Sequence, residues 1–104
     1  MTLVDTILNK SKEIHNHRTV QDVLNHAMTE LGELALEVQI DQGKSYKQPG
    51  ADGIVGEALD LVACMIDMIY VHNPDLTEDD MIKLMLPKLI KWKEKANQVQ
   101  MKQI

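Results

Sequence analysis

Apolar residues recur every three or four positions along almost the whole chain, a spacing typical of amphipathic α-helices. The pattern predicts four helices, over residues 3–14, 20–40, 54–71 and 78–99. Three glycines and a proline fall between Asp41 and Gly53, which predicts a loop between the second and third helices. With no internal repeat, we expect an all-α fold with four helices in a single domain that spans residues 1–104.

Local signals mark where these helices begin and end. Thr19 is followed three residues later by Asp22, and Thr77 precedes three consecutive acids. A threonine that accepts a backbone hydrogen bond, with acids in the first turn, stabilises the start of a helix. Pro74 ends the third helix because proline disfavours helical geometry in the residue before it. Pro87 lies inside the fourth helix, which we expect it to kink.

The composition favours a helical oligomer. Phe is absent and only 3% of the residues are aromatic, so the apolar content is Leu, Ile, Val, Met and Ala. Such residues suit helix-on-helix packing, but a domain of this length buries only a modest core. A modest core with long apolar stripes predicts self-association. We therefore expect a bundle completed by homo-oligomerisation, as a homodimer or a dimer of dimers.

Charge and cysteine usage exclude several classes of protein. The formal net charge is −5, whereas proteins that bind a nucleic-acid duplex usually carry a basic surface. Cys64 is the only cysteine, so no intrachain disulfide can form. The N-terminus does not resemble a signal peptide, and Asp67 interrupts the longest apolar segment, Leu61–Tyr70. We expect a soluble cytoplasmic protein with neither a nucleic-acid nor a membrane partner.

Paired acids on the two middle helices are the most informative feature. Glu30 and Glu33 lie on the second helix, and Glu57 and Asp60 lie on the third. Residues three positions apart share one face of a helix, and each pair borders an apolar stripe. If the two helices pack antiparallel, the pairs can converge. Three further side chains extend the same faces as candidate supporting groups: His26, Glu37 and Asp67.

Converging carboxylates need protons or a cation. Two like charges about 4 Å apart repel by about 4 kcal/mol at an effective dielectric near 20. A site with only oxygen ligands suits Mg²⁺ or Mn²⁺. Both ions also take phosphate oxygens as ligands and can activate water. The alternative is that such pairs are ordinary solvated acids, which are common on helix surfaces.

The acidic motifs also resemble those of a known family. The segments Glu30-Leu-Gly-Glu33 and Glu57-Ala-Leu-Asp60 are similar to the ExxE and ExxD signature of MazG-like nucleotide pyrophosphatases, which are related to dimeric dUTPases and dCTP pyrophosphatases. The resemblance covers most of residues 20–100. It implies a MazG-like helical bundle with Mg²⁺ held by these four acids as its catalytic centre. It also implies hydrolysis of a nucleoside triphosphate, by preference a deoxynucleotide, to the monophosphate and pyrophosphate, as house-cleaning of nucleotide pools.

Basic and aromatic residues supply candidates for the rest of a nucleotide site. The resemblance implies phosphate-binding residues on the last helix, where Lys91 and Lys95 share a face with Lys88 nearby, and Lys44 is a loop candidate. These lysines also suit a solvated helix end. Candidates for a base or ribose pocket are His15, His17, Tyr46 and Trp92. A lone tryptophan is more often a core or interface anchor, so we expect Trp92 in the core.

Two other accounts compete with the pyrophosphatase hypothesis. A di-iron carboxylate bundle would need Glu-x-x-His motifs, and no glutamate here is followed three residues later by histidine. A non-catalytic helical adaptor, or an antitoxin-like oligomer, would carry the same acids as solvated surface groups. Tight Mg²⁺ binding that is lost in Glu33→Ala and Asp60→Ala would distinguish the enzyme from the adaptor.

Overall fold

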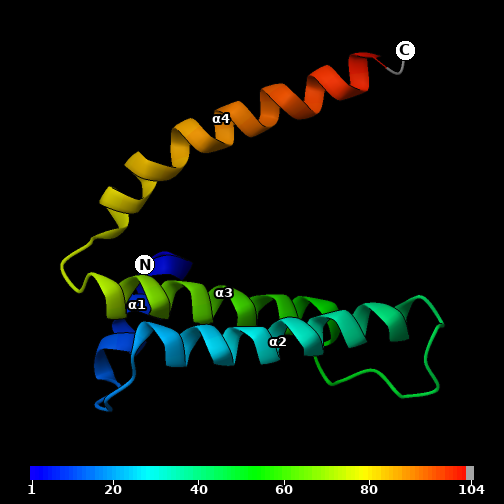
Figure 1. Ribbon diagram of the computed structural model, residues 1–104, viewed down its shortest axis with the longest axis horizontal. Coiled ribbons are helices and arrows are strands. Elements are labelled where there is room, and N and C mark those ends of the chain that lie inside the picture. The colour runs from blue at the N-terminus through cyan, green and yellow to red at the C-terminus, as the bar shows by residue number, and fades with distance from the viewer. Residues whose placement is uncertain (103–104) are drawn as a thin grey trace. The chain divides into compact units, whose positions relative to one another are not determined.

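The chain folds into four α-helices, and the described part contains no strand, which confirms the all-α prediction (Figure 1). The computed structural model describes the backbone of residues 1–102 and side chains through Val99. The helices are α1 Leu3–Glu13, α2 Val20–Asp41, α3 Gly53–His72 and α4 Glu78–Lys102. Within the described residues, no helix combines the length and hydropathy needed to cross a membrane.

The predicted caps are present at two helix starts. The Thr19 hydroxyl accepts a hydrogen bond from the Asp22 amide (3.1 Å), and the Asp22 carboxylate accepts one from the Thr19 amide (2.9 Å). The same reciprocal pair joins Thr77 and Asp80 at the start of α4. These bonds satisfy amides that have no partner inside the helix, which is why both helices begin where the sequence predicts.

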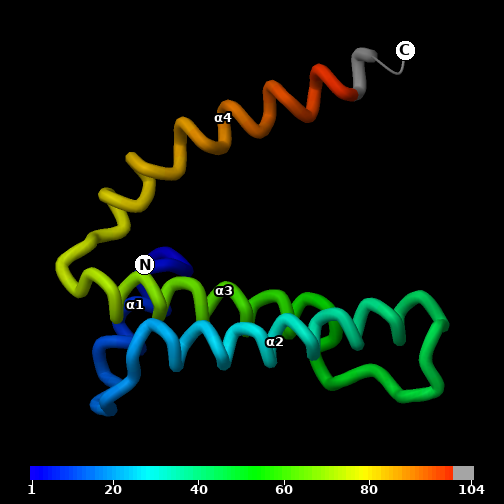
Figure 2. Tube along the Cα trace, viewed as in Figure 1, coloured from blue at the N-terminus to red at the C-terminus, as the bar shows by residue number. Residues whose placement is uncertain are grey.

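The first 74 residues form one compact unit in which α3 is central. The loop over residues 42–52 reverses the chain, so α2 and α3 lie side by side and antiparallel (Figure 2). α1 packs against α3 as well. The buried apolar side chains come from all three helices: Leu8, Val23, Ala27, Cys64 and Ile66. The small core matches the sequence-based expectation.

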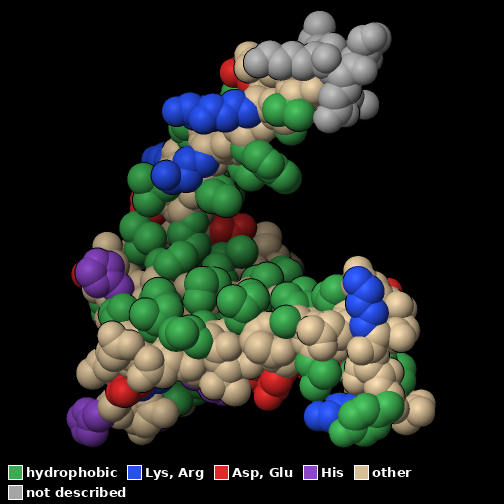
Figure 3. All heavy atoms as spheres, turned by 45° about the vertical axis from the view of Figure 1, so that its right-hand side comes forward, with side chains coloured by type: hydrophobic (Ala, Val, Ile, Leu, Met, Phe, Trp, Pro, Cys, Tyr) green, Lys and Arg blue, Asp and Glu red, His purple; other side chains and the backbone are tan. Residues whose placement is uncertain are grey.

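Several large apolar side chains of α2 and α3 are exposed. On α2, Met28 and Leu31 are 64% and 53% exposed, and on α3, Val55 and Leu59 are 70% and 45% exposed. Hydrophobic side chains accordingly gather on the molecular surface (Figure 3). A helix that is apolar on nearly every side is normally buried on every side, and within the first unit α3 packs against α1 and α2.

The second unit begins at Asp75 and contains α4. Pro87 lies inside α4, which continues on both sides of it. Trp92 is 69% exposed, so our expectation that it lies in the core is wrong for the single chain. The physical reason is that α4 is the only helix of its unit, and one helix cannot bury its own apolar stripe.

Candidate metal centre

Three of the four predicted acidic ligands lie together. Glu30 and Glu33, one turn apart on α2, and Glu57 on α3 each offer a carboxylate oxygen, and these atoms lie within 4.8 Å of one another. The antiparallel packing of α2 and α3 brings Glu57 opposite the α2 pair. Asp60 is not a member of this group, although its charge acts on Glu30 and Glu57. We call Glu30, Glu33 and Glu57 the acidic cluster.

Two oxygens of the acidic cluster are buried without a partner. The Glu30 side chain is only 13% exposed, and Oε2 of Glu30 and Oε2 of Glu57 are both buried and accept no hydrogen bond. A buried polar atom without a partner costs free energy, and more so when it carries charge. These orphaned oxygens fit a divalent cation, since Mg²⁺ and Mn²⁺ take carboxylate oxygens as ligands.

The electrostatics of the cluster are unfavourable without a cation. Burial raises the pKa of Glu30, and the charges of Glu33 and Asp60 raise it further. Burial likewise raises the pKa of Glu57, with the same two acids and Glu30 adding to the effect. His26 Nε2 lies 3.3 Å from Glu30 Oε1, but the imidazole is 65% exposed and only partly offsets this repulsion. A cation would remove the conflict.

The raised pKa values predict how stability depends on pH. A carboxyl group whose pKa is higher in the folded than in the unfolded state stabilises the fold below its unfolded pKa. That contribution is lost as the pH rises through the folded value. We therefore expect the contribution of Glu30 and Glu57 to the melting temperature in EDTA to fall as the pH rises above the ordinary glutamate range. Melting curves of the wild type and of Glu30→Gln/Glu57→Gln, with and without Mg²⁺, test this.

In that comparison the double variant should lose this downward trend, because it lacks both titrating groups. Saturating Mg²⁺ should also abolish the trend in the wild type by favouring the ionised carboxylates. Parallel pH profiles of wild type and double variant in EDTA would contradict the assignment.

Glu37 and Asp67, the two acids among the supporting candidates, have partners within the protein. Glu37 is 7% exposed, and its carboxylate accepts a hydrogen bond from the Gly50 amide, which ties the loop over residues 42–52 to α2. Asp67 pairs with Arg18 and Ser11. Of the three supporting candidates, only His26 contacts the acidic cluster.

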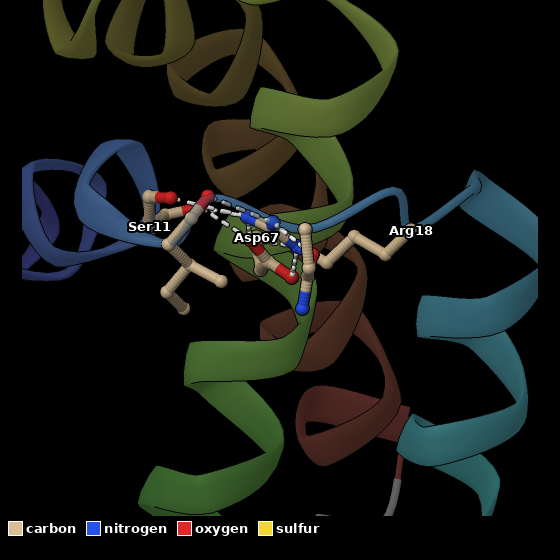
Figure 4. Close-up of polar contacts among 5 residues, drawn as sticks. Ser11, Arg18 and Asp67 are labelled. Carbon is tan, nitrogen blue, oxygen red and sulfur yellow. Dashed lines mark hydrogen bonds and ion pairs between the residues drawn. The ribbon is translucent and has the colours of Figure 1, made fainter.

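A part-buried polar network that the sequence did not predict joins α1, α3 and the segment between α1 and α2 (Figure 4). Arg18 donates through Nε to Asp67 Oδ2 at 2.9 Å and through Nη2 to Asp67 Oδ1 at 2.6 Å. The Ser11 hydroxyl donates to Asp67 Oδ1, and the Ser11 carbonyl accepts from Arg18 at 3.1 Å. Arg18 is the only arginine of the chain, and a guanidinium is the cation best suited to such a bidentate pair.

Two hollows flank this network. The larger, about 320 Å³, lies between α1 and α3, and the smaller, about 150 Å³, lies between α2 and α3. Cys64 and Asp67 line both, and His26 lines only the smaller. His26 therefore connects the smaller hollow to the acidic cluster, because it lines the hollow and contacts Glu30.

Three of the four candidate base-pocket residues lie in the first unit, and that unit does not bring them together. His15 and His17 are exposed before α2, whereas Tyr46 is 92% exposed after it. The 22 residues of α2 separate these positions by about 33 Å. Trp92 lies in the other unit and is also exposed. None of these four side chains lines either hollow.

The candidate phosphate-binding lysines are exposed. Lys44 lies in the loop that follows α2, and Lys88, Lys91 and Lys95 lie on α4 in the second unit. From Lys83 to Lys95 this helix carries five lysines and a single acid, Glu94, so its middle is strongly basic. The first unit is acidic, with 11 acids and five basic residues, whereas the second, with five acids and six lysines, is close to neutral overall.

Comparisons with known proteins yield no relative. No model of a protein family matches the chain, and neither does any curated protein or solved structure.

Proposed function

We propose that this protein is a Mg²⁺-dependent nucleoside triphosphate pyrophosphohydrolase, with Mn²⁺ as an alternative ion. The observation that carries the proposal is the pair of buried, unpartnered oxygens of Glu30 and Glu57 in a cluster with Glu33. Such oxygens on neighbouring helices suit a divalent cation better than they suit a solvated surface. The resemblance of both acidic segments to the MazG-like signature supports the same reaction.

In this proposal the acidic cluster holds the cation, and Asp60 adds charge beside it. A bound Mg²⁺ supplies charge neutralisation at the phosphates and polarises a phosphate oxygen or a water. Glu33 is exposed, unlike Glu30, so its carboxylate can meet a substrate that enters from solvent. His26 orients Glu30 through their 3.3 Å contact. The triphosphate of a deoxynucleotide is the expected substrate, and its products are the monophosphate and pyrophosphate.

Lysines and a second copy of the chain complete the proposed enzyme. Lys91 and Lys95, with Lys88 and Lys44 as further candidates, would hold phosphate oxygens as point charges. The uncovered apolar side chains of α2 and α3 support a homodimer or dimer of dimers with a MazG-like bundle, because burying Met28, Leu31 and Val55 would be favourable. We place the enzyme in the cytoplasm, where it would remove unwanted nucleotides.

A substrate panel tests this proposal. We expect purified protein to release pyrophosphate from at least one common ribo- or deoxynucleoside triphosphate in the presence of Mg²⁺ and to release none in EDTA. Nucleoside monophosphate is measured in the same samples, since the proposed cleavage yields one monophosphate for each pyrophosphate. A folded sample that releases no pyrophosphate from any of these substrates would remove the enzyme proposal.

The second candidate is a non-catalytic helical oligomer that acts as an adaptor or an antitoxin-like binding protein. The exposed apolar surface of α3 is the observation that favours it, since large uncovered apolar patches mark interaction sites. The two candidates differ in their expected response to Mg²⁺. An adaptor with solvated acids should bind Mg²⁺ no more tightly in the wild type than in Glu33→Ala or Asp60→Ala.

A further inference from the structure

The buried carboxylate of Glu37 holds the loop that leads into α3. Glu37 lies on α2 one turn beyond Glu33, a member of the acidic cluster, and is 7% exposed. Its Oε1 atom accepts a hydrogen bond from the Gly50 amide, in the loop over residues 42–52 (Figure 2). A buried carboxylate is unfavourable unless it accepts hydrogen bonds, so this bond helps to permit the burial of Glu37. It also fastens the chain three residues before α3 begins at Gly53.

The close approach of loop and carboxylate requires a glycine at position 50. A Cβ atom built on Gly50 would lie 2.6 Å from Glu37 Oε1, closer than a side chain tolerates. Apart from the chain neighbours of Gly50, the Glu37 carboxylate is the only group among the described residues within 4 Å of that position. A methyl group added at Gly50 would therefore displace this carboxylate and nothing else.

The start of α3 is weakly specified by its own sequence. Asp52 is the N-cap residue, yet its side chain caps no amide of the first turn, whereas threonine side chains cap α2 and α4. Two of the first four residues of α3 are glycines, Gly53 and Gly56, which weaken a helix. The hydrogen bond between Glu37 and Gly50 therefore supplies a long-range anchor where local signals are weak.

The position of this helix start matters because it carries Glu57. Glu57 is the fifth residue of α3, and its carboxylate lies in the acidic cluster with those of Glu30 and Glu33. Without a cation, three carboxylates at this spacing repel one another, which favours any movement of the first turns of α3 away from α2. The anchor at Gly50, seven residues before Glu57, opposes that movement.

We propose that Glu37 is a positioning residue of the cation site, which by holding Gly50 keeps Glu57 opposite the acids of α2. The inference rests on the proposed function, because it takes the acidic cluster to be a cation site. Glu37 acts through its hydrogen bond and not through its charge. A glutamine at position 37 keeps an acceptor oxygen, so it should replace Glu37, whereas an alanine should not. Removing a group that orients a metal ligand typically weakens metal binding about 10- to 100-fold.

Calorimetric titration of the full-length chain with Mn²⁺ tests the proposal. We expect Glu37→Ala to weaken binding about tenfold, the lower end of that range. Glu37→Gln should weaken it by no more than about twofold, since its amide oxygen still accepts from Gly50. Gly50→Ala should match Glu37→Ala, and because Gly50 is exposed this variant should fold even where Glu37→Ala does not. The double variant Glu37→Ala/Gly50→Ala should bind no more weakly than Glu37→Ala, because both changes break the same bond.

The hydration of bound Mn²⁺ distinguishes lost positioning from a general loosening of the fold. When Glu57 no longer reaches the ion, water takes its coordination position. Water-proton relaxation at saturating Mn²⁺ should therefore be faster in Glu37→Ala and Gly50→Ala than in the wild type, and unchanged in Glu37→Gln. Weaker binding with unchanged hydration in both alanine variants would overturn the positioning role.

The matched control is Glu13→Ala, which truncates an exposed glutamate at the end of α1. Glu13 is 64% exposed and pairs with Lys10, so Mn²⁺ binding should change less than about twofold. Wild-type affinity in Glu37→Ala and Gly50→Ala would overturn this inference and leave the proposed function standing. Equal losses in Glu37→Gln and Glu37→Ala would overturn it as well, because the charge of Glu37 would then be the property that matters. A wild-type protein that binds no Mn²⁺ would overturn the inference and the proposed cation site together.

Discussion

Replacing Glu57 by glutamine is expected to abolish Mg²⁺-dependent activity and to stabilise the metal-free protein. Glu57 Oε2 is buried without a partner and lies in a cluster with two other carboxylates. The glutamine is isosteric, removes one of the mutually repelling charges, and can donate its amide to Glu30 or Glu33. Since loss of an outer partner of a metal ligand already costs 10- to 100-fold, loss of a ligand should lower pyrophosphate release by more than about 100-fold.

Two measurements separate the opposite effects of Glu57→Gln. The melting temperature in EDTA should rise relative to wild type, whereas the increase that Mg²⁺ gives to the wild type should disappear. Glu13→Gln removes the same charge at a distant exposed site and should change neither quantity. A lower melting temperature of Glu57→Gln in EDTA would mean that this carboxylate has a structural partner, and the cation site would lose its main support.

The helices could be predicted because their signals are local. The apolar period and the pairs Thr19–Asp22 and Thr77–Asp80 act within one or two turns of the chain. Predicted boundaries lie within one residue of those in the structure, except at the end of α4, which runs to Lys102 instead of Val99. Helix ends depend on capping and on the following turn, so a sequence locates them well where a cap is present.

The acidic cluster could be predicted only in part. Helical spacing places Glu30 and Glu33 on one face without any tertiary information. Their meeting with Glu57 depends on the loop that makes α2 and α3 antiparallel. The glycines between the two helices indicated that loop. The rotation of each helix about its own axis then decides which acid of α3 faces Glu30 and Glu33. Asp60 is left outside the acidic cluster. Periodicity alone does not determine that rotation.

The role of Asp67 was missed because its partner is distant in sequence. Asp67 shares its helix face with Glu57 and Asp60, which made it a candidate supporting acid. Its guanidinium partner, Arg18, is 49 residues away and belongs to the segment between α1 and α2. The one available signal was that the chain has a single arginine among its many lysines. Similarly, the buried role of Glu37 depends on a loop amide, that of Gly50.

Replacing Asp67 by alanine is expected to destabilise the fold more than any surface substitution. The side chains of Arg18 and Asp67 are only 14% and 20% exposed, and their bonds connect α3 to the segment between α1 and α2. Removing one partner of a buried ion pair leaves the other unpaired, which costs about 3 kcal/mol at the low end of measured cases. For a chain of this size we expect the melting temperature to fall by more than about 10 °C.

A graded series of variants tests the origin of this loss. Asp67→Asn keeps the shape and part of the hydrogen bonding, so it should cost less than Asp67→Ala. Arg18→Met in the Asp67→Leu background removes both charges and should recover part of the stability. The exposed pair of Lys10 and Glu13 is the control, where Lys10→Ala should cost less than about 1 kcal/mol.

The stability contributed by the pair of Arg18 and Asp67 depends on pH with the opposite sign to that of the acidic cluster. Burial opposes ionisation of Asp67, but hydrogen bonds from Arg18 and Ser11 and the charge of Arg18 outweigh it, so the pKa of Asp67 is lowered. The stabilisation is therefore present above the unfolded aspartate pKa and is lost as the pH falls through the lower folded value. Urea unfolding at pH 7 and at a series of lower pH values measures the free energy of unfolding of the wild type and of Asp67→Ala. The difference between the two free energies should shrink once the pH falls below the ordinary aspartate range. A difference that stays constant there would mean that packing, and not the charge on Asp67, holds α1 and α3 together.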